Sequence, residues 1–227
     1  MTTVLFWDID GTLIDSCGAG RIALTEAASQ MIGESVDLSS VKMAGLTELA
    51  IAISILETLG LMASEKNLKK LLSLYKKNIA PCLHRTQGYI IDGVKEILDS
   101  LQSCEQVISI LLTGNCETGA WAKLAHYGLD HYFNLGSFGE NHCDRTELAK
   151  YALALAQQKV ANLNLDRCYV IGDTPHDIRC GQAIGAKTIA IANQHYGVEE
   201  LASHNSSLVW EKFPTPPSFM AQLGLIP

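Results

Sequence analysis

The sequence predicts an α/β protein with a doubly wound, Rossmann-like parallel sheet core and an inserted all-helical cap domain. Two observations lead to this fold class. From residue 88 onward, short apolar runs rich in β-branched residues alternate with helical patterns, as in a sheet that helices cover on both faces. Before that, residues 16–87 contain helical patterns only, although a strand-like run precedes them.

Five apolar runs are expected to form the strands of the core. Their continuous hydrophobicity suits strands buried on both faces of a parallel sheet, and they cover residues 3–7, 107–112, 168–172, 187–192 and, more weakly, 207–210. The helices of the core are predicted over residues 92–103, 116–128, 145–158 and 176–185. Gly128 and Gly185 are expected to end two of them, because glycine readily adopts the left-handed conformation after a helix.

Three helices are predicted within the insertion, over residues 18–33, 47–60 and 64–80. Thr47 and Ser64 are plausible N-caps of the second and third, and Pro81 is expected to end the third. The chain therefore divides into a catalytic core of residues 1–15 and 88–227 and a helical cap domain of residues 16–87. The joints are expected near residues 14–18 and 84–90.

Composition and charge narrow the possible functions. The chain carries a formal net charge of −7 and no cluster of Lys and Arg, so the basic surface of a nucleic-acid-binding protein is not expected. No apolar run reaches membrane-spanning length, and no secretory signal is visible. Seven cysteines without a CxxC pair are typical of reduced thiols. We expect a cytoplasmic monomer or weak dimer with no nucleic-acid or membrane partner.

Polar residues follow three of the predicted strands, where ligands bind in doubly wound sheets. They include four carboxylates, Asp8 and Asp10 after the first strand and Asp173 and Asp177 after "CYVIG". Asp8 and Asp10 are two residues apart and share one face of a strand, and Asp173 and Asp177 are about one helical turn apart. Carboxylates gathered in a partly dry site repel one another, and a divalent cation relieves that repulsion. Oxygen ligands of this kind favour Mg²⁺ as the cofactor.

The other groups at the strand ends suit a phosphate. The segment "TGNCE" offers a hydroxyl from Thr113, a backbone that can be approached closely at Gly114, an amide from Asn115 and a helix N-terminus. Gly11 and Thr12 follow the first strand in the same way and are also predicted to bind substrate. A cation, Arg145, begins a later helix and could bind phosphate oxygens with two donors. One carboxylate is then free to attack phosphorus.

The motifs "DIDGTL", "LLTGN" and "VIGDTPHD", in this order, resemble those of the haloacid dehalogenase superfamily, in its phosphatase branch with a helical cap after the first strand. By this resemblance, Asp8 is the nucleophile, Asp10 is the general acid and base, and Thr113 binds phosphate. Asp173 is a metal ligand, with Asp177 a direct or water-mediated partner. Asp8 and the backbone carbonyl of Asp10 are the other protein ligands to Mg²⁺.

This sequence departs from the resembling family at the third motif. Most relatives have a lysine that bridges the nucleophile and the phosphate. Here we expect Arg145 to take that role, because it opens its helix and so faces the strand ends, whereas Lys150 lies five residues further on.

Asp10 distinguishes between the activities of the superfamily. Members that dehalogenate lack an acid at this position, whereas an ester's leaving oxygen must be protonated. We therefore expect a Mg²⁺-dependent phosphomonoester hydrolase that acts on a small phosphorylated metabolite, either phosphoglycolate-like or a sugar phosphate. A phosphosugar mutase of the same superfamily, or a non-catalytic binding or regulatory protein on the same scaffold, is the alternative.

The substrate is expected to be selected by the cap domain. In resembling caps a loop of the form xGxT faces the active site, and "MAGLTELA" matches it, so Gly45, Leu46 and Thr47 are the candidate specificity residues. Close relatives often have a basic residue where Leu46 stands. Its absence weakens the case for a second anionic group on the substrate, although Lys42 or Arg21 could substitute.

Overall fold

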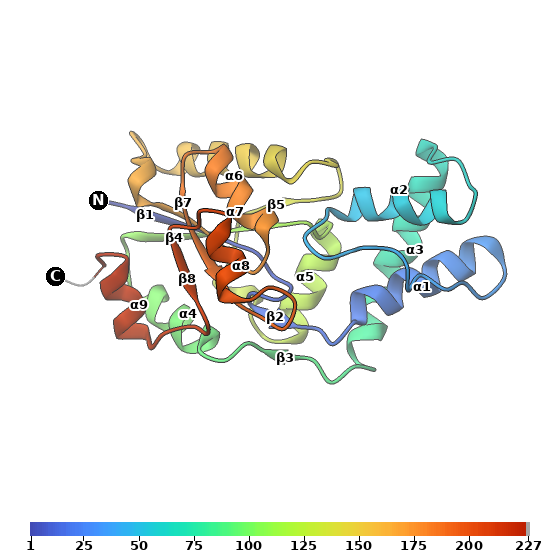
Figure 1. Ribbon diagram of the computed structural model, residues 1–227, viewed down its shortest axis with the longest axis horizontal. Coiled ribbons are helices and arrows are strands. Elements are labelled where there is room, and N and C mark those ends of the chain that lie inside the picture. Colours follow the sequence, from blue (N-terminus) through green and yellow to red (C-terminus); the bar gives the residue numbers. More distant parts are fainter. Residues whose placement is uncertain (226–227) are drawn as a thin grey trace.

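The computed structural model describes residues 1–225 and confirms the predicted fold class (Figure 1). Its centre is a six-stranded parallel sheet with the order β5-β4-β1-β6-β7-β8. The strands are β1 (Thr3–Trp7), β4 (Val107–Thr113), β5 (Gly136–Phe138), β6 (Cys168–Gly172), β7 (Lys187–Ile191) and β8 (Leu208–Trp210). Because β1 lies between β4 and β6, the segments that follow these three strands meet at one edge of the sheet.

Successive residues of β1 pack against different helical layers. Leu5 and Trp7 belong to a cluster with α4 (Val94–Gln102), α5 (Glu117–His126) and α9 (Pro216–Gln222). Val4 and Phe6 belong to a second cluster, with α6 (Arg145–Lys159) and α7 (Pro175–Ala183). All four side chains are fully buried, and burying one such side chain is worth about 1.5–3 kcal/mol. The strand between two apolar layers thus gives the residues after it a rigid base.

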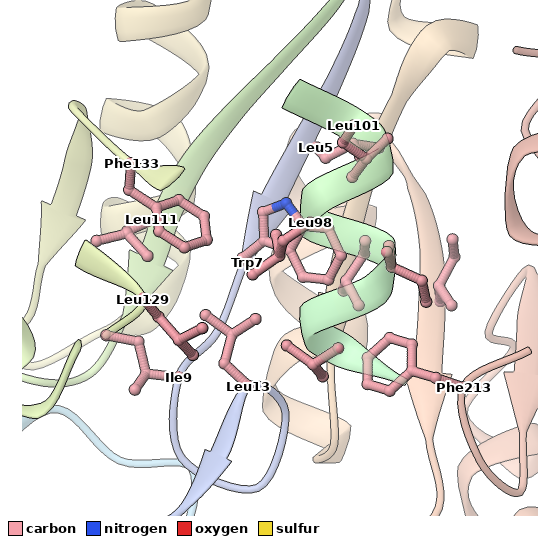
Figure 2. Packing of buried hydrophobic residues seen from close by; sticks show 14 of the residues in the cluster. Leu5, Trp7, Ile9, Leu13, Leu98, Leu101, Leu111, Leu129, Phe133 and Phe213 are labelled. Atoms are coloured by element: carbon pink, nitrogen blue, oxygen red, sulfur yellow. The ribbon is translucent and has the colours of Figure 1, made fainter. Parts of the chain in front are cut away.

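The C-terminal segment, whose role the sequence left open, packs on the core. Trp7 stacks on Phe219 with ring centroids 6.1 Å apart, and Phe213 lies 6.4 Å from the same ring. Figure 2 shows Phe213 close to Trp7 and Leu98 of α4 in this cluster. The helix α9 was not predicted, and neither was α8 (Val198–Ser203), which buries Leu201. Both are too short for a helical period to be recognised.

The insertion contains three helices, α1 (Ala19–Ile32), α2 (Glu48–Thr58) and α3 (Glu65–Leu83), which lie together at one end of the molecule (Figure 1). They share a separate apolar cluster, which is joined to the core by the fully buried Cys116. The predicted caps are present, since Thr47 accepts a hydrogen bond from the backbone of Ala50 and Ser64 from that of Asn67. The exact division into residues 16–87 and the rest stays a prediction.

The third helix of the insertion corrects the prediction that Pro81 would end it. The helix α3 continues through Pro81 to Leu83. Proline removes one backbone donor, but here the ring is exposed and only two helical residues follow it. The buried side chains of Cys82 and Leu83 hold that last turn against the apolar cluster of the insertion. Packing therefore outweighs the local preference of proline.

Short elements mark the two chain crossings between core and insertion. Strand β2 (Ile14–Asp15) pairs antiparallel with β3 (Tyr89–Ile90), within the regions where the joints were predicted. Two single-turn 3₁₀ helices, η1 (Asp130–Tyr132) and η2 (Leu165–Arg167), complete the elements. Within residues 1–225, no helix has both the length and the hydrophobicity needed to cross a bilayer.

Candidate active site

A cavity of about 800 Å³ lies where β1, β4 and β6 end, with the core on one side and the insertion on the other. We define the cavity floor as seven polar residues of the core that line the cavity, and the helical wall as five residues of the insertion that also line it. The floor comprises Asp8, Asp10, Thr113, Asn115, Lys123, Arg145 and Asp173, and the wall comprises Leu24, Met43, Leu46, Glu48 and Ile51.

Three of the predicted acidic residues lie close together, two of them on the floor and one beneath it. Asp8, Asp173 and Asp177 are buried, and each offers a carboxylate oxygen within 4.8 Å of the others. Burial raises the pKa of Asp8 to about 6, with Arg145 opposing the shift and Asp177 adding to it. Burial and the charges of Asp177 and Asp8 also raise the pKa of Asp173 well above its usual value. This part of the site therefore favours an added positive charge.

Arg145 supplies part of that charge, as predicted from its place at the start of α6. Its guanidinium group forms ion pairs with Asp8, at 3.4 Å, and with Asp177. The Nε of Arg145 is buried and has no hydrogen-bond partner within residues 1–225, so one donor remains for an anion in the cavity. The alternative cation, Lys150, is exposed and pairs with Glu147 at 2.7 Å, so the structure does not bring it to the floor.

Asp177 lies beneath the floor, not on the surface of the cavity. One of its oxygens accepts from Arg145, and the other accepts from the backbone and hydroxyl of Thr174, at 3.0 and 2.7 Å. The latter bonds form the capping box that begins α7. Asp177 does not line the cavity, which distinguishes it from Asp8 and Asp173.

Asp10 faces a different partner, Lys123, which sequence reasoning missed. The Nζ of Lys123 lies 2.6 Å from Asp10 Oδ2 and 2.6 Å from Asn115 Oδ1, and Asn115 also donates to Asp10. Burial raises the pKa of Asp10, but the charge and hydrogen bond of Lys123 outweigh it and lower the pKa below its usual value. The available signal was a lysine on the apolar face of its helix, between the buried Ala120 and Leu124.

The end of β4 brings Thr113 to the cavity, and the loop after it brings Gly114 and Asn115. The hydroxyl oxygen of Thr113 accepts from the backbone and the side-chain amide of Asn115, at 3.3 and 2.8 Å, which fixes the loop. A Cβ at Gly114 would lie 2.2 Å from the carbonyl oxygen of Leu46. Only glycine therefore permits the insertion to dock this closely on the loop.

The two residues after Asp10 differ in position. Gly11 lines the cavity with φ of +80°, and a Cβ there would lie 2.2 Å from the Asp173 carboxylate. Thr12, in contrast, is fully buried and donates to Asp173 at 3.3 Å, so the structure does not place it on the cavity. Asn193, a further missed residue, donates to Asp173 from the other side at 2.6 Å. Asp173 is thereby held in place by two neutral donors.

The predicted specificity loop contributes Gly45 and Leu46 to the cavity, whereas Thr47 is fully buried as the N-cap of α2. The next residue, Glu48, was not predicted. Its carboxylate accepts from the backbone of Cys116 at 2.7 Å and from the hydroxyl of Tyr75 at 2.5 Å, while its own backbone donates to Gly114 at 2.7 Å. Burial raises the pKa of Glu48. This residue thus connects the insertion to the loop that follows β4.

Comparisons with known proteins place this arrangement in a family. The sequence model of the haloacid dehalogenase-like hydrolases matches residues 4–191. No curated protein matches the chain significantly by sequence.

Solved structures match the chain over nearly its whole length. A haloacid dehalogenase hydrolase (family IA, variant 3) from Entamoeba histolytica has a TM-score of 0.75 at 21% identity, covering 99% of this chain and 100% of that one. CbbY from Rhodobacter sphaeroides, solved with phosphate, gives 0.74 at 12% identity, covering 93% and 95%. A predicted phosphatase from Clostridium acetobutylicum gives 0.71 at 19% identity, covering 100% of both chains. The chain belongs to the haloacid dehalogenase-like hydrolase family.

Proposed function

We propose that the protein is a Mg²⁺-dependent phosphatase that hydrolyses a small phosphomonoester through an aspartyl-phosphate on Asp8. One observation carries the proposal: Asp8 stands on the cavity floor between a group of carboxylates and the guanidinium of Arg145. A carboxylate in this position can attack phosphorus, and the cation beside it can stabilise the charge that develops on the phosphoryl oxygens.

The donors for a phosphoryl group come from three elements that meet at the floor. The free Nε of Arg145, the loop of Thr113 and Gly114, and the backbone at Gly11 all border the cavity next to Asp8. Because these groups are fixed by helices, caps and the parallel sheet, they are already ordered before a substrate binds. Ordered donors stabilise a transition state without a further cost of reorganisation.

The residues of the floor also fit a divalent cation. Asp8 and Asp173 are buried, their pKa values are raised in the absence of a counter-charge, and their oxygens are close enough to share one ion. Bound Mg²⁺ would supply positive charge that keeps Asp8 ionised and balances the phosphoryl oxygens. We propose Asp8, Asp173 and the backbone carbonyl of Asp10 as its protein ligands. Asp177, which pairs with Arg145 and does not line the cavity, would hold Arg145 and act on the metal only indirectly.

Asp10 is proposed to move protons at the leaving oxygen and at the attacking water. Its pair with Lys123 favours the ionised form, which is the base needed to activate water in the second step. A phosphoryl dianion next to Asp10 would favour its protonated form, which is the acid needed in the first step. About 42% of its side chain is exposed, so Asp10 can reach a ligand in the cavity while Lys123 holds it from below.

The insertion is proposed to act as a cap domain that excludes water and selects the substrate. It already lies against the floor through Gly45, Leu46 and Glu48. A small phosphorylated metabolite, phosphoglycolate-like or a sugar phosphate, would fit a cavity of about 800 Å³. CbbY, a structural neighbour, has been solved with phosphate and with xylulose-(1,5)-bisphosphate. Cytoplasmic location and a monomeric or weakly dimeric state stay predictions.

The test is the hydrolysis of p-nitrophenyl phosphate by the whole chain with Mg²⁺, with EDTA and with the variant Asp8→Asn. We expect turnover that requires Mg²⁺ and falls by at least about 10³-fold in Asp8→Asn. Asp166→Asn is the matched control, since Asp166 is exposed and distant from the cavity floor. Turnover that persists with EDTA or in Asp8→Asn would contradict the proposed mechanism. Phosphate binding without turnover of any phosphomonoester would favour the non-catalytic alternative.

A further inference from the structure

We propose that the cavity selects a phosphomonoester whose leaving group carries no second anionic group, such as a polyol, a sugar or an amino alcohol. This inference rests on the phosphatase function proposed above, and of the two substrate classes named there it favours a sugar phosphate over phosphoglycolate, whose leaving group carries a carboxylate. The inference follows from the positions and partners of the basic residues that line the cavity within residues 1–225.

The two cations of the cavity floor are already engaged. Lys123 donates to Asp10 and Asn115, both at 2.6 Å, and only 3% of the residue is exposed. Arg145 pairs with Asp8 and Asp177 beside the phosphoryl position. Removing Arg145 from its partners would leave buried carboxylates without a counter-charge, and removing Lys123 would take a buried ammonium group away from the one carboxylate that pairs with it, so neither is available for an acidic leaving group.

Arg21 and Lys42, the two basic residues that could compensate for the absence of a cation at position 46, do not offer a free charge to the cavity. Arg21 borders the cavity, but its two terminal nitrogens donate to the carbonyl oxygens of Leu38, at 2.6 Å, and Val41, at 3.1 Å. These bonds hold the loop that leads to Gly45 and direct the guanidinium into the insertion. Lys42 is exposed and does not border the cavity. The guanidinium of Arg21 thus binds the backbone of the insertion, and Lys42 lies outside the cavity.

Most side chains of the helical wall and of the charged rim around it are apolar or acidic. Four members of the helical wall are hydrophobic, and the fifth, Glu48, is a carboxylate that accepts from Cys116 and Tyr75. The rim of the cavity adds three carboxylates, from Asp15, Asp92 and Glu211, against two exposed basic residues, Lys212 and His195. A carboxylate or second phosphate on the substrate would lose water there and gain repulsion. A hydroxyl group would meet no repulsion there, and an ammonium group would be attracted to the carboxylates of the rim.

Matched pairs of substrates test this inference on the wild-type protein at fixed ionic strength. Glycerol 3-phosphate and 3-phosphoglycerate differ by a hydroxymethyl group against a carboxylate, and phosphoethanolamine and phosphoserine differ by one carboxylate. We expect kcat/KM to be at least about tenfold higher for the uncharged or cationic member of each pair. Equal values, or a preference for the carboxylate members, would overturn the inference while leaving the phosphatase function intact. Absence of turnover on all four and on p-nitrophenyl phosphate would overturn both.

A charge placed in the helical wall provides the second measurement. Leu46→Lys adds a cation next to the phosphoryl position, where it should raise kcat/KM for 3-phosphoglycerate relative to glycerol 3-phosphate by about tenfold or more. Leu46→Met is the matched control, which adds length without charge and should keep the wild-type preference. Thermal unfolding of both variants verifies that they fold. A folded Leu46→Lys that keeps the wild-type preference would contradict the assignment of the helical wall to selection.

Discussion

The cavity floor and the helical wall face the same space but are built differently. On the floor, buried charges are held in pairs, such as Arg145 with Asp8 and Lys123 with Asp10, by elements of the parallel sheet. The wall is mostly apolar, and its one carboxylate, Glu48, binds neutral donors. The difference indicates that the chemistry is fixed in the core, while the insertion supplies shape, exclusion of water and selection.

Among variants that leave the proposed nucleophile in place, the largest effect is expected from breaking the pair of Lys123 and Asp10 on the floor. Lys123→Met should lower kcat by about 100-fold, with a smaller change in KM, because Asp10 and Asn115 lose the donor that holds them. Lys123→Arg should restore part of the rate, since it keeps the charge. The measurement is steady-state hydrolysis of glycerol 3-phosphate. Lys159→Met is the control, because Lys159 is an exposed residue in the last turn of α6. A variant with wild-type kcat would show that Asp10 needs no cation below it.

A change at Glu48 in the helical wall should lower the stability of the fold more than it lowers the rate of catalysis. Glu48→Ala leaves the backbone donor of Cys116 and the hydroxyl of Tyr75 without their shared acceptor, so we expect a loss of about 2–4 kcal/mol in the free energy of unfolding. Glu48→Gln, which keeps an acceptor, should lose less than half as much. Urea unfolding measures both. Equal losses for the two variants would indicate that the charge, not the hydrogen bonds, connects the insertion to the core.

The affinity for Mg²⁺ should rise with pH, because two carboxylates of the floor must lose their protons to bind the ion. Because the pKa of Asp8 is about 6 without metal and that of Asp173 is also raised, protons compete with Mg²⁺ below that pH. The dissociation constant for Mg²⁺ should therefore fall about tenfold as the pH rises from about 5 to about 6. Calorimetric titration with MgCl₂ tests this, with CaCl₂ as a comparison ion. An affinity that is constant or weakens over this range would contradict the ligand set.

The smallest effect is expected at the cap of α2 in the insertion. Thr47→Ala removes the side-chain acceptor for the backbone of Ala50 and should lower the free energy of unfolding by about 1 kcal/mol. Thr47→Ser keeps that acceptor and serves as the control. Because Thr47 does not line the cavity, kcat/KM should change little in either variant, as enzyme assays can verify. A large loss of activity in Thr47→Ala alone would assign this residue a role on the substrate.

The same comparison explains what could be predicted from the sequence. Thr113 ends one strand of the parallel sheet, and Asp8 and Asp173 directly follow two others, so their convergence on one edge follows from short motifs and the fold class. Lys123 and Glu48 are single residues on helices, and their positions depend on how those helices dock.

The sequence motifs also did not predict the direction in which individual side chains point. Thr12 and Thr47 belong to predicted site segments, but their hydroxyl groups point to Asp173 and to the backbone of α2. Pro81 shows the same limit for secondary structure, since buried neighbours in the last turn kept the helix intact. Sequence patterns were reliable where covalent spacing fixed the geometry, and insufficient where tertiary packing decided it.

The most direct test of the aspartyl-phosphate mechanism uses Asp10→Ala with p-nitrophenyl phosphate and Mg²⁺. Nitrophenolate leaves without a proton, so phosphoryl transfer to Asp8 should continue, while hydrolysis of the aspartyl-phosphate slows without its base. We predict a burst of about one nitrophenolate per protein molecule and a phosphoryl group on the peptide that contains Asp8. No burst and no phosphorylated peptide, while Asp10→Ala keeps the wild-type turnover rate, would contradict the mechanism.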